Sequence, residues 1–359
     1  MSEDGTALPA GVDVVVVGAG ITGASIAHHL ARRGVSVVVL DRSPTPAAGA
    51  TGRSGGMVRG YDPDPVIGDL ARASLAAYRD PARWRSGRAP LRAVGAVTAA
   101  DPAEEPALRE AAARIAGSAH VVAGQAEVAG VRLAGGVALV EPEAGWVAPA
   151  EVAADWLAQA RADGAVVRQG VRVLGVEDRG GRPVVRTDAG VLAAGVVVAA
   201  VGPWAAEPVP GLRPATPVRA RSIQVTVVAR PADAPAHPTF VDLRTGGYAK
   251  PVDADRTLIG LPHLVWDSSF DAPPDPGHAR ATLSALTAHF PWLTAAAHLD
   301  TIRATDAYGP SPADGLLDRT DVPHVWSVRG WNGGGVKTAP EAGRLVADAC
   351  AADASSDLV

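Results

Sequence analysis

The N-terminal segment carries the clearest pattern of apolar and polar positions in the chain. Val12–Val17 is a continuous run of mostly β-branched residues, which is typical of a strand buried on both faces of a parallel sheet. From about Ile21 to Arg33, apolar residues recur with helical spacing, and Gly34 is expected to end that helix. A second strand over Val35–Leu40 ends at Asp41. The pattern therefore predicts a complete βαβ unit.

The rest of the chain continues as a mixture of helices and short strands. Helices are expected over residues 66–79, 104–116, 150–163, 276–289 and from 335 to about 352. Strands are expected over residues 93–98, 136–140, 165–168, 171–178, 183–188, 191–200, 223–228, 247–251, 257–261 and 324–328. We predict an α/β (α+β) fold, with a Rossmann-like domain and a second domain built on a mostly antiparallel sheet.

Composition narrows the class of protein. The 359 residues are 47% hydrophobic and carry a net charge of -5, which excludes a disordered chain. The absence of a basic block argues against a nucleic-acid or membrane-surface protein. The single cysteine, Cys350, excludes a disulfide framework and a multi-cysteine metal site, and His28-His29 lack metal-ligand spacing. With no apolar run long enough for a membrane span and no signal-peptide pattern, we expect a soluble cytoplasmic protein; its oligomeric state is not predicted.

The turn after the first strand reads Gly18-x-Gly20-x-x-Gly23. The first glycine permits a tight turn, the second admits a pyrophosphate close to the backbone, and the third lets helix and strand pack closely. Asp41, at the end of the second strand, is placed to accept hydrogen bonds from a ribose. Together these features predict dinucleotide binding, but the βαβ unit alone does not distinguish NAD from FAD.

Two distant segments favour FAD. Gly49–Gly56 follows the second strand, where a second phosphate-facing loop would lie, and Gly330–Gly335 stands between a strand and the last helix. That helix N-terminus suits the side of an isoalloxazine on which negative charge appears on reduction. The residues expected to bind the cofactor are Gly18, Ala19, Gly20, Ile21, Thr22, Gly23, Asp41, Arg42, Thr51, Arg53, Ser54, Gly55, Gly56, Met57, Val173, Gly202, Trp204, Gly330, Trp331, Asn332, Gly333, Gly334, Gly335 and Lys337.

Five segments together resemble the D-amino-acid-oxidase-like FAD oxidoreductases, within them the monomeric sarcosine oxidase and glycine oxidase branch. They are residues 14–27, 51–59, 197–204, 248–251 with 258–260, and 330–343. The resemblance implies a discontinuous FAD domain (1–88, 150–214 and 306–359) and a substrate domain (89–149 and 215–305). It also implies oxidation of the C–N bond of an amino acid or amine.

The resemblance further implies roles for individual side chains. Arg59 matches an arginine that binds a substrate carboxylate in sarcosine-oxidase-like members, and Lys337 matches a lysine that completes this clamp; alternatively, Arg59 lies on a solvated rim and Lys337 pairs with a neighbouring carboxylate. Tyr248 falls where the family places an aromatic hydroxyl over the flavin. The position of the family's oxygen-activating lysine reads Leu258 here.

Two more residues are candidates near that strand. Lys250 shares a strand face with Tyr248 and could replace the missing lysine; alternatively, it is a surface cation near Asp253. His263 could contact substrate, although it could equally be an ordinary loop histidine.

Covalent members use a cysteine where this chain reads Thr305–Pro310, so we expect noncovalent FAD. The expected reaction is hydride transfer from a carboxylate-bearing amine to flavin N5, with reoxidation by O2, giving H2O2, or by another acceptor. Two alternatives remain open: an FAD enzyme acting on a non-amine substrate, such as a hydroxy acid or a biosynthetic intermediate, and a noncatalytic FAD-binding subunit.

Overall fold

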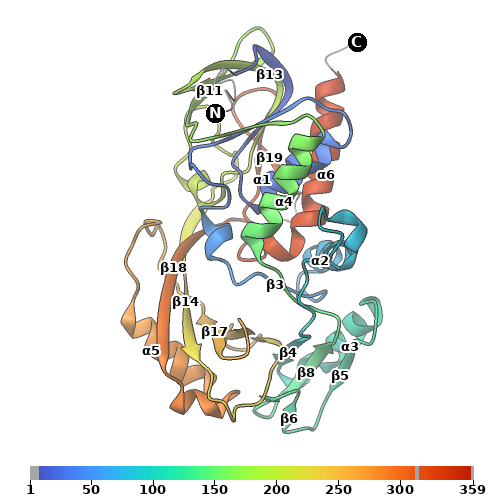
Figure 1. Cartoon of the computed structure of the whole chain (residues 1–359), viewed down its shortest axis with the longest axis vertical. Coiled ribbons are helices and arrows are strands. Elements are labelled where there is room, and N and C mark those ends of the chain that lie inside the picture. Colours follow the sequence, from blue (N-terminus) through green and yellow to red (C-terminus); the bar gives the residue numbers. More distant parts are fainter. Residues whose placement is uncertain (1–7, 312–314, 357–359) are drawn as a thin grey trace.

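The computed structural model describes residues 8–311 and 315–356, with the side chains of the last two of these excepted. The molecule is elongated, with one sheet and its helices at one end and a second large sheet at the other (Figure 1). Segments from both halves of the sequence meet in each part, as the mixed colours of the ribbon show (Figure 1).

The first sheet has a parallel centre. Its strands are ordered β10 (Val166–Gln169), β2 (Val37–Asp41), β1 (Gly11–Val17), β13 (Gly190–Ala199), β12 (Pro183–Thr187) and β11 (Val173–Asp178), and β20 (Val325–Val328) pairs with β13 and with β19 (Leu317–Arg319). β1 runs parallel to β2 and β13, with Val14 opposite Val37 and Val196. The valines of β1 are buried because helices and other chain segments cover both faces.

Three helices pack around α1 (Ile21–Ala31) and the sheet. α4 (Pro149–Ala162) and α6 (Gly335–Ser356) both contact α1, and α2 (Pro65–Arg79) contacts α6. The Ser25 hydroxyl in α1 donates to the Ala339 carbonyl in α6 at 2.8 Å. The last described helix therefore lies directly against the first.

The second sheet is antiparallel at every pairing except β15 with β4. Its order is β18 (His298–Tyr308), β14 (Arg219–Ala229), β17 (Arg256–Leu261), β16 (Tyr248–Pro251), β15 (Thr239–Asp242), β4 (Ala96–Ala100), β8 (Val137–Glu141) and β5 (His120–Val122). Ala249 and Ile259 face a core that Phe240, Phe290 and Leu286 of α5 (Pro276–Leu286) complete. Side chains alternate along a strand, so Tyr248, Lys250 and Leu258 lie on the opposite face.

Smaller elements complete the fold. They are the strand pairs β3 (Met57–Val58) with β9 (Gly145–Trp146) and β6 (Glu127–Val128) with β7 (Val131–Arg132), the helix α3 (Glu105–Arg114), and short 3-10 turns at Ala50–Arg53, Pro81–Arg83, Pro102–Glu104, Gly202–Ala206 and Pro291–Ala295. Among the described residues no helix is long and apolar enough to span a membrane.

The predicted fold class is confirmed: a parallel-centred sheet stands beside a mostly antiparallel one. The expected strands at 223–228 and 247–251 are β14 and β16, but β15 and β18 were not predicted as strands. The β18 sequence (His-Leu-Asp-Thr-Ile-Arg-Ala-Thr-Asp-Ala-Tyr) has polar side chains on both faces of the strand, so it lacks the alternation of apolar and polar residues by which a strand is predicted. The exact division of the chain into two domains stays a prediction.

Candidate functional site

The turn between β1 and α1 requires glycine at two positions. Gly18 has φ +110°, and a Cβ there would lie 2.5 Å from the Ala200 carbonyl oxygen. A Cβ at Gly23 would lie 1.9 Å from the Gly18 carbonyl oxygen. The two glycines thus allow the start of α1 to approach the ends of β1 and β13, and they leave the helix N-terminus open to an anion.

Asp41 and Thr51 hold this turn from two other segments. The Asp41 carboxylate accepts hydrogen bonds from the Ala19 N–H at 2.6 Å and the Ser43 N–H at 2.7 Å. Thr51 Oγ1 accepts from the Ile21 N–H at 3.0 Å. Carboxylate oxygens have further lone pairs, so Asp41 can still accept from a ribose hydroxyl.

A cavity of about 740 Å³ opens beyond the carboxyl ends of β1, β2 and β13, where open α/β sheets bind ligands. Of the predicted cofactor residues, those lining it are Gly18, Gly20, Ile21, Thr22, Asp41, Arg42, Thr51, Ser54, Val173, Gly202, Trp204, Gly330, Trp331, Gly333 and Gly335. Segments separated by some 300 positions therefore border one space of the size that small-molecule and cofactor sites have, about 300–1,000 Å³.

The other predicted cofactor residues lie outside this lining, namely Ala19, Gly23, Arg53, Gly55, Gly56, Met57, Asn332, Gly334 and Lys337. Arg53 instead donates to the carbonyls of Phe270 and Arg303, and it thereby ties its loop to the second sheet. The Asn332 side chain exchanges two hydrogen bonds with the Gly309 backbone. Met57 pairs with Trp146 between β3 and β9.

Aromatic residues close one side of the cavity. The Arg42 guanidinium lies 4.0 Å from the ring centre of Trp204, which is a cation–π distance, and the Trp204 and Phe270 ring centres are 5.1 Å apart. Phe270 and Asp306 line the cavity although sequence reasoning missed them. Phe270 lies in a loop without a readable motif, and Asp306 lies on β18, for which no strand was predicted.

Arg59 and Lys337 come together in a buried charged cluster. Arg59 Nε is buried without a hydrogen-bond partner in the described part of the chain, whereas Lys337 Nζ forms an ion pair with Asp62. Burial, helped by the nearby Arg59 charge, lowers the pKa of Lys337 to about 8. The predicted pair is thus adjacent, but Lys337 already has a carboxylate partner.

Glu141 completes this cluster and was missed from the sequence. It is 2% exposed, and its carboxylate accepts from the Gly60 N–H at 2.6 Å and the Tyr61 N–H at 3.3 Å. Burial raises its pKa, while the Gly60 N–H and the Arg59 charge act in the opposite direction. The sequence did contain a signal for Glu141, namely an acidic residue at the end of an apolar strand.

Tyr248 and Lys250 extend from β16 on the face opposite α5. Lys250 Nζ lies 4.0 Å from the ring centre of Trp146, and burial with the Arg92 charge lowers its pKa to about 8. Lys250 is directly opposite Leu258 in the β16–β17 pair, and a Cβ at Gly55 would lie 3.7 Å from Leu258 Cδ2. The Tyr248 ring packs over Gly260, and burial raises its pKa.

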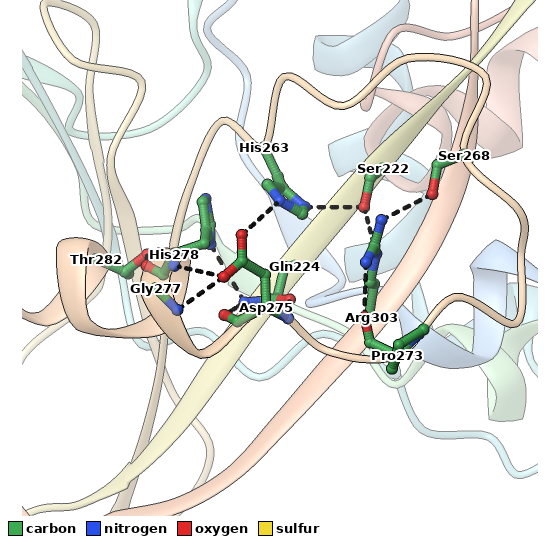
Figure 2. A network of polar contacts seen from close by, with 10 residues as sticks. All are labelled: Ser222, Gln224, His263, Ser268, Pro273, Asp275, Gly277, His278, Thr282 and Arg303. Atoms are coloured by element: carbon green, nitrogen blue, oxygen red, sulfur yellow. Dashed lines mark hydrogen bonds and ion pairs between the residues drawn. The ribbon is translucent and has the colours of Figure 1, made fainter.

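His263 lies in a different environment. Figure 2 shows it in a polar network at the start of α5, where its Nδ1 is 2.9 Å from Ser222 Oγ and its Nε2 is 3.6 Å from an Asp275 oxygen. Arg303 donates to the same Ser222 hydroxyl at 2.9 Å (Figure 2). The structure therefore brings His263 together with groups on the α5 side of the sheet and not with Arg59, Lys337 or Lys250.

The region where related enzymes attach their flavin covalently holds no cysteine, since residues 305–310 read Thr-Asp-Ala-Tyr-Gly-Pro. Cys350 is 1% exposed in α6, and burial raises its pKa to about 12, so its thiolate is not available for attachment. We predict that acid precipitation of purified protein leaves all flavin in the supernatant, measured by absorbance. A yellow washed pellet would contradict noncovalent binding.

A parallel-centred sheet with a glycine-rich turn and a cofactor-sized cavity beyond its strand ends is the arrangement of α/β proteins that bind dinucleotides. The chain belongs to the FAD dependent oxidoreductase (DAO) family, whose model matches residues 13–349. It is therefore an FAD-dependent oxidoreductase.

Curated relatives and solved structures agree with this membership. The chain is 31% identical over 321 residues to the tRNA 5-methylaminomethyl-2-thiouridine biosynthesis bifunctional protein MnmC of Azoarcus sp. (strain BH72), covering 84% of this chain and 48% of that protein. The chain thus spans at most about half the length of the curated relatives it matches.

Among solved structures, L-proline dehydrogenase from P. horikoshii has a TM-score of 0.81 at 20% identity, covering 95% of this chain and 93% of that one. Iminodiacetate oxidase from Chelativorans sp. BNC1 has a TM-score of 0.74 at 25% identity, covering 93% and 94%. Glycine oxidase from Geobacillus kaustophilus has a TM-score of 0.77 at 24% identity, covering 96% and 95%.

Proposed function

We propose that this protein oxidises the C–N bond of an amino acid or related carboxylate-bearing amine to an imine. The observation that carries the proposal is Arg59, a guanidinium with a buried Nε that lacks a hydrogen-bond partner within the described ranges, next to Lys337 at the start of α6. A guanidinium matches a carboxylate in shape and charge, and the Arg59 Nε–H has no hydrogen-bond acceptor among the described residues. The names of the similar structures, which include glycine oxidase, proline dehydrogenase and iminodiacetate oxidase, support an amine as the reacting group.

The residues around the cavity fit FAD. Gly18 and Gly23 leave space that a Cβ would fill, the N-terminus of α1 faces the cavity through Gly20, Ile21 and Thr22, and Asp41 lies where a ribose would be held. When bound, FAD supplies the acceptor for a hydride from the carbon that carries the nitrogen.

The chain's own groups prepare the substrate for that step. Arg59 would bind and orient the carboxylate, and the buried positive charges of Arg59 and Lys337 would lower the pKa of the substrate ammonium. A neutral amine is needed because its lone pair becomes the second C–N bond as the hydride leaves. Leu258 on β17 and Trp146 on β9, which both lie beside Lys250, would keep water from the reacting carbon.

The proposal is tested by anaerobic flavin reduction against a substrate panel, followed by measurement of H2O2 when air returns. Amino acids or secondary amino acids should bleach the flavin absorbance. Reduction by hydroxy acids alone would favour a non-amine substrate, and a flavin that no member of a broad panel reduces would favour a noncatalytic FAD-binding role.

Lys250 is proposed to favour electron transfer to O2 through its positive charge, in place of the family lysine that Leu258 replaces. The pKa of Lys250 is lowered to about 8, so the side chain is charged below this pH and loses its charge as the pH rises through it. We predict that reoxidation by O2, followed by stopped flow, slows above about pH 8. Lys250→Met should be slower than the wild type by about 10- to 100-fold below pH 8 and should approach it at higher pH, whereas Lys250→Arg should stay fast above pH 8. Equal rates in the methionine variant and the wild type below pH 8 would exclude this role.

A further inference from the structure

A second cationic group lies on the face of the large sheet that carries Tyr248 and Lys250. Arg221 extends from β14, and its guanidinium stacks on Tyr308 of β18, with Cζ 3.6 Å from the ring centre and one Nη donating to the Tyr308 hydroxyl. Arg221 Nε is buried and has no hydrogen-bond partner in the part of the chain that the structure describes. The Nε–H of this guanidinium is therefore still available to donate a hydrogen bond to a ligand.

The charge of Arg221 is poorly compensated by the protein. No ion pair to Arg221 occurs within residues 8–311 and 315–356. Asp306 is its cross-strand neighbour, but this carboxylate accepts from the Ala307 N–H at 2.8 Å, and burial raises its pKa. Arg219, two residues away, differs in each respect: it is exposed and is bound to Asp267 at 2.6 Å.

Tyr248 adds a second hydroxyl to the group. Its ring packs over Gly260, and it is near enough to Tyr308 and Arg221 for both to influence its pKa. Its hydroxyl has no hydrogen bond to any described residue. An arginine with two tyrosine hydroxyls offers several donors in one place, which is the donor set that a carboxylate or similar oxyanion needs.

Both cationic groups border the same glycine turn. A Cβ at Gly333 would lie 3.3 Å from the Tyr308 hydroxyl, and a Cβ at Gly334 would lie 3.3 Å from Lys337 Cε. Lys337 is in turn close enough to Arg59 for the Arg59 charge to lower its pKa. Gly333 itself lines the large cavity, as do Asp306 and Ala307 of β18. The Arg59 cluster and the Arg221 cluster therefore flank one turn beside the cofactor cavity.

We infer that Arg221, Tyr248 and Tyr308 bind a second acidic group of the substrate, so that the enzyme prefers an amino or imino acid with two oxyanionic ends. This inference rests on the proposed function and narrows it. One acid would lie at Arg59 and the other at Arg221, with the C–N bond between them. Amino monoacids would then use only one of the two groups.

The test compares matched substrate pairs in which one carboxylate is replaced by an amide or removed. Aspartate and glutamate are compared with asparagine and glutamine, and iminodiacetate with sarcosine, by anaerobic flavin reduction in the wild type, Arg221→Met, Tyr308→Phe and the control Arg219→Met. In the wild type at least one diacid should exceed its monoacid partner in reduction rate over Kd by about 10- to 100-fold. Arg221→Met should abolish that preference while leaving the monoacid rate within about threefold, and Arg219→Met should change neither.

A binding measurement keeps the inference testable if no amine reduces the flavin. Succinate and glutarate are titrated against butyrate by calorimetry with the FAD-loaded protein. Tighter dicarboxylate binding that disappears in Arg221→Met but not in Arg219→Met would support the second anion site even though the proposed oxidation had failed. Reduction by monoacids with no diacid preference, or an equal loss for both members of a pair in Arg221→Met, would overturn the second site while leaving amine oxidation intact.

Discussion

Replacing Gly23 by alanine should yield protein that does not retain FAD. The new Cβ would lie 1.9 Å from the Gly18 carbonyl oxygen, a distance that forces α1 away from β1. Overpacking of this kind typically costs 1–3 kcal/mol, and here the displacement falls on the turn that would hold the pyrophosphate. We expect FAD affinity to fall by at least about 100-fold, measured by fluorescence titration of the apoprotein.

The matched control is Gly11→Ala, at the start of β1, the strand that leads into this turn. Its Cβ would lie 3.8 Å from the Ala193 carbonyl oxygen, which is ordinary contact, so this variant should bind FAD as the wild type does. Circular dichroism separates loss of the fold from loss of the cofactor. A folded Gly23→Ala protein with unchanged FAD affinity would show that the glycine turn does not hold the cofactor.

Replacing Arg59 by methionine should have the second largest effect. Methionine keeps much of the side-chain volume but removes the charge and the donors, so a bound carboxylate loses a charge-assisted pair worth about 3 kcal/mol. We expect kcat/KM for a carboxylate-bearing substrate to fall by roughly 100-fold or more. Arg59→Lys should recover only part of this, because an ammonium does not reproduce the guanidinium fork.

An amine without a carboxylate provides the internal control for that variant. Its already low kcat/KM should fall far less in Arg59→Met than that of the carboxylate-bearing substrate, since it loses only the effect of the Arg59 charge on the pKa of the amine and no ion pair. Arg79→Met serves as a control on the protein side, because Arg79 is exposed and paired with Glu143. An equal fall for both amines would mean that Arg59 supports the structure and does not recognise the carboxylate.

The sequence was most informative where one short segment contains all the residues of a local structural motif. The valine run of β1, the three glycines and Asp41 lie within one βαβ unit, and each has a local reason to be there. The Gly330–Gly335 turn was assigned to the same cofactor because it precedes a helix N-terminus, and the structure places both segments beside the same cavity.

Long-range side-chain arrangements could not be predicted in the same way. Arg221, Tyr248 and Tyr308 lie on three strands, and their proximity depends on strand order and register, which the sequence does not reveal. Asp62 and Glu141 were missed because each became significant only through its buried neighbours. His263 shows the reverse: it follows the right strand, but the chain takes it to the α5 side of the sheet.

The contact between α1 and α6 has a consequence for biosynthesis. A Cβ at Gly343 would lie 2.2 Å from Ser25 Oγ, so the two helices approach closely, and the Gly330–Gly335 turn reaches the cavity only with α6 in place. The glycine turn after β1 leaves the ribosome long before its partner segment does. A nascent chain interrupted before α6 therefore has an open, incomplete binding site, and capture of the flavin has to follow translation of that helix.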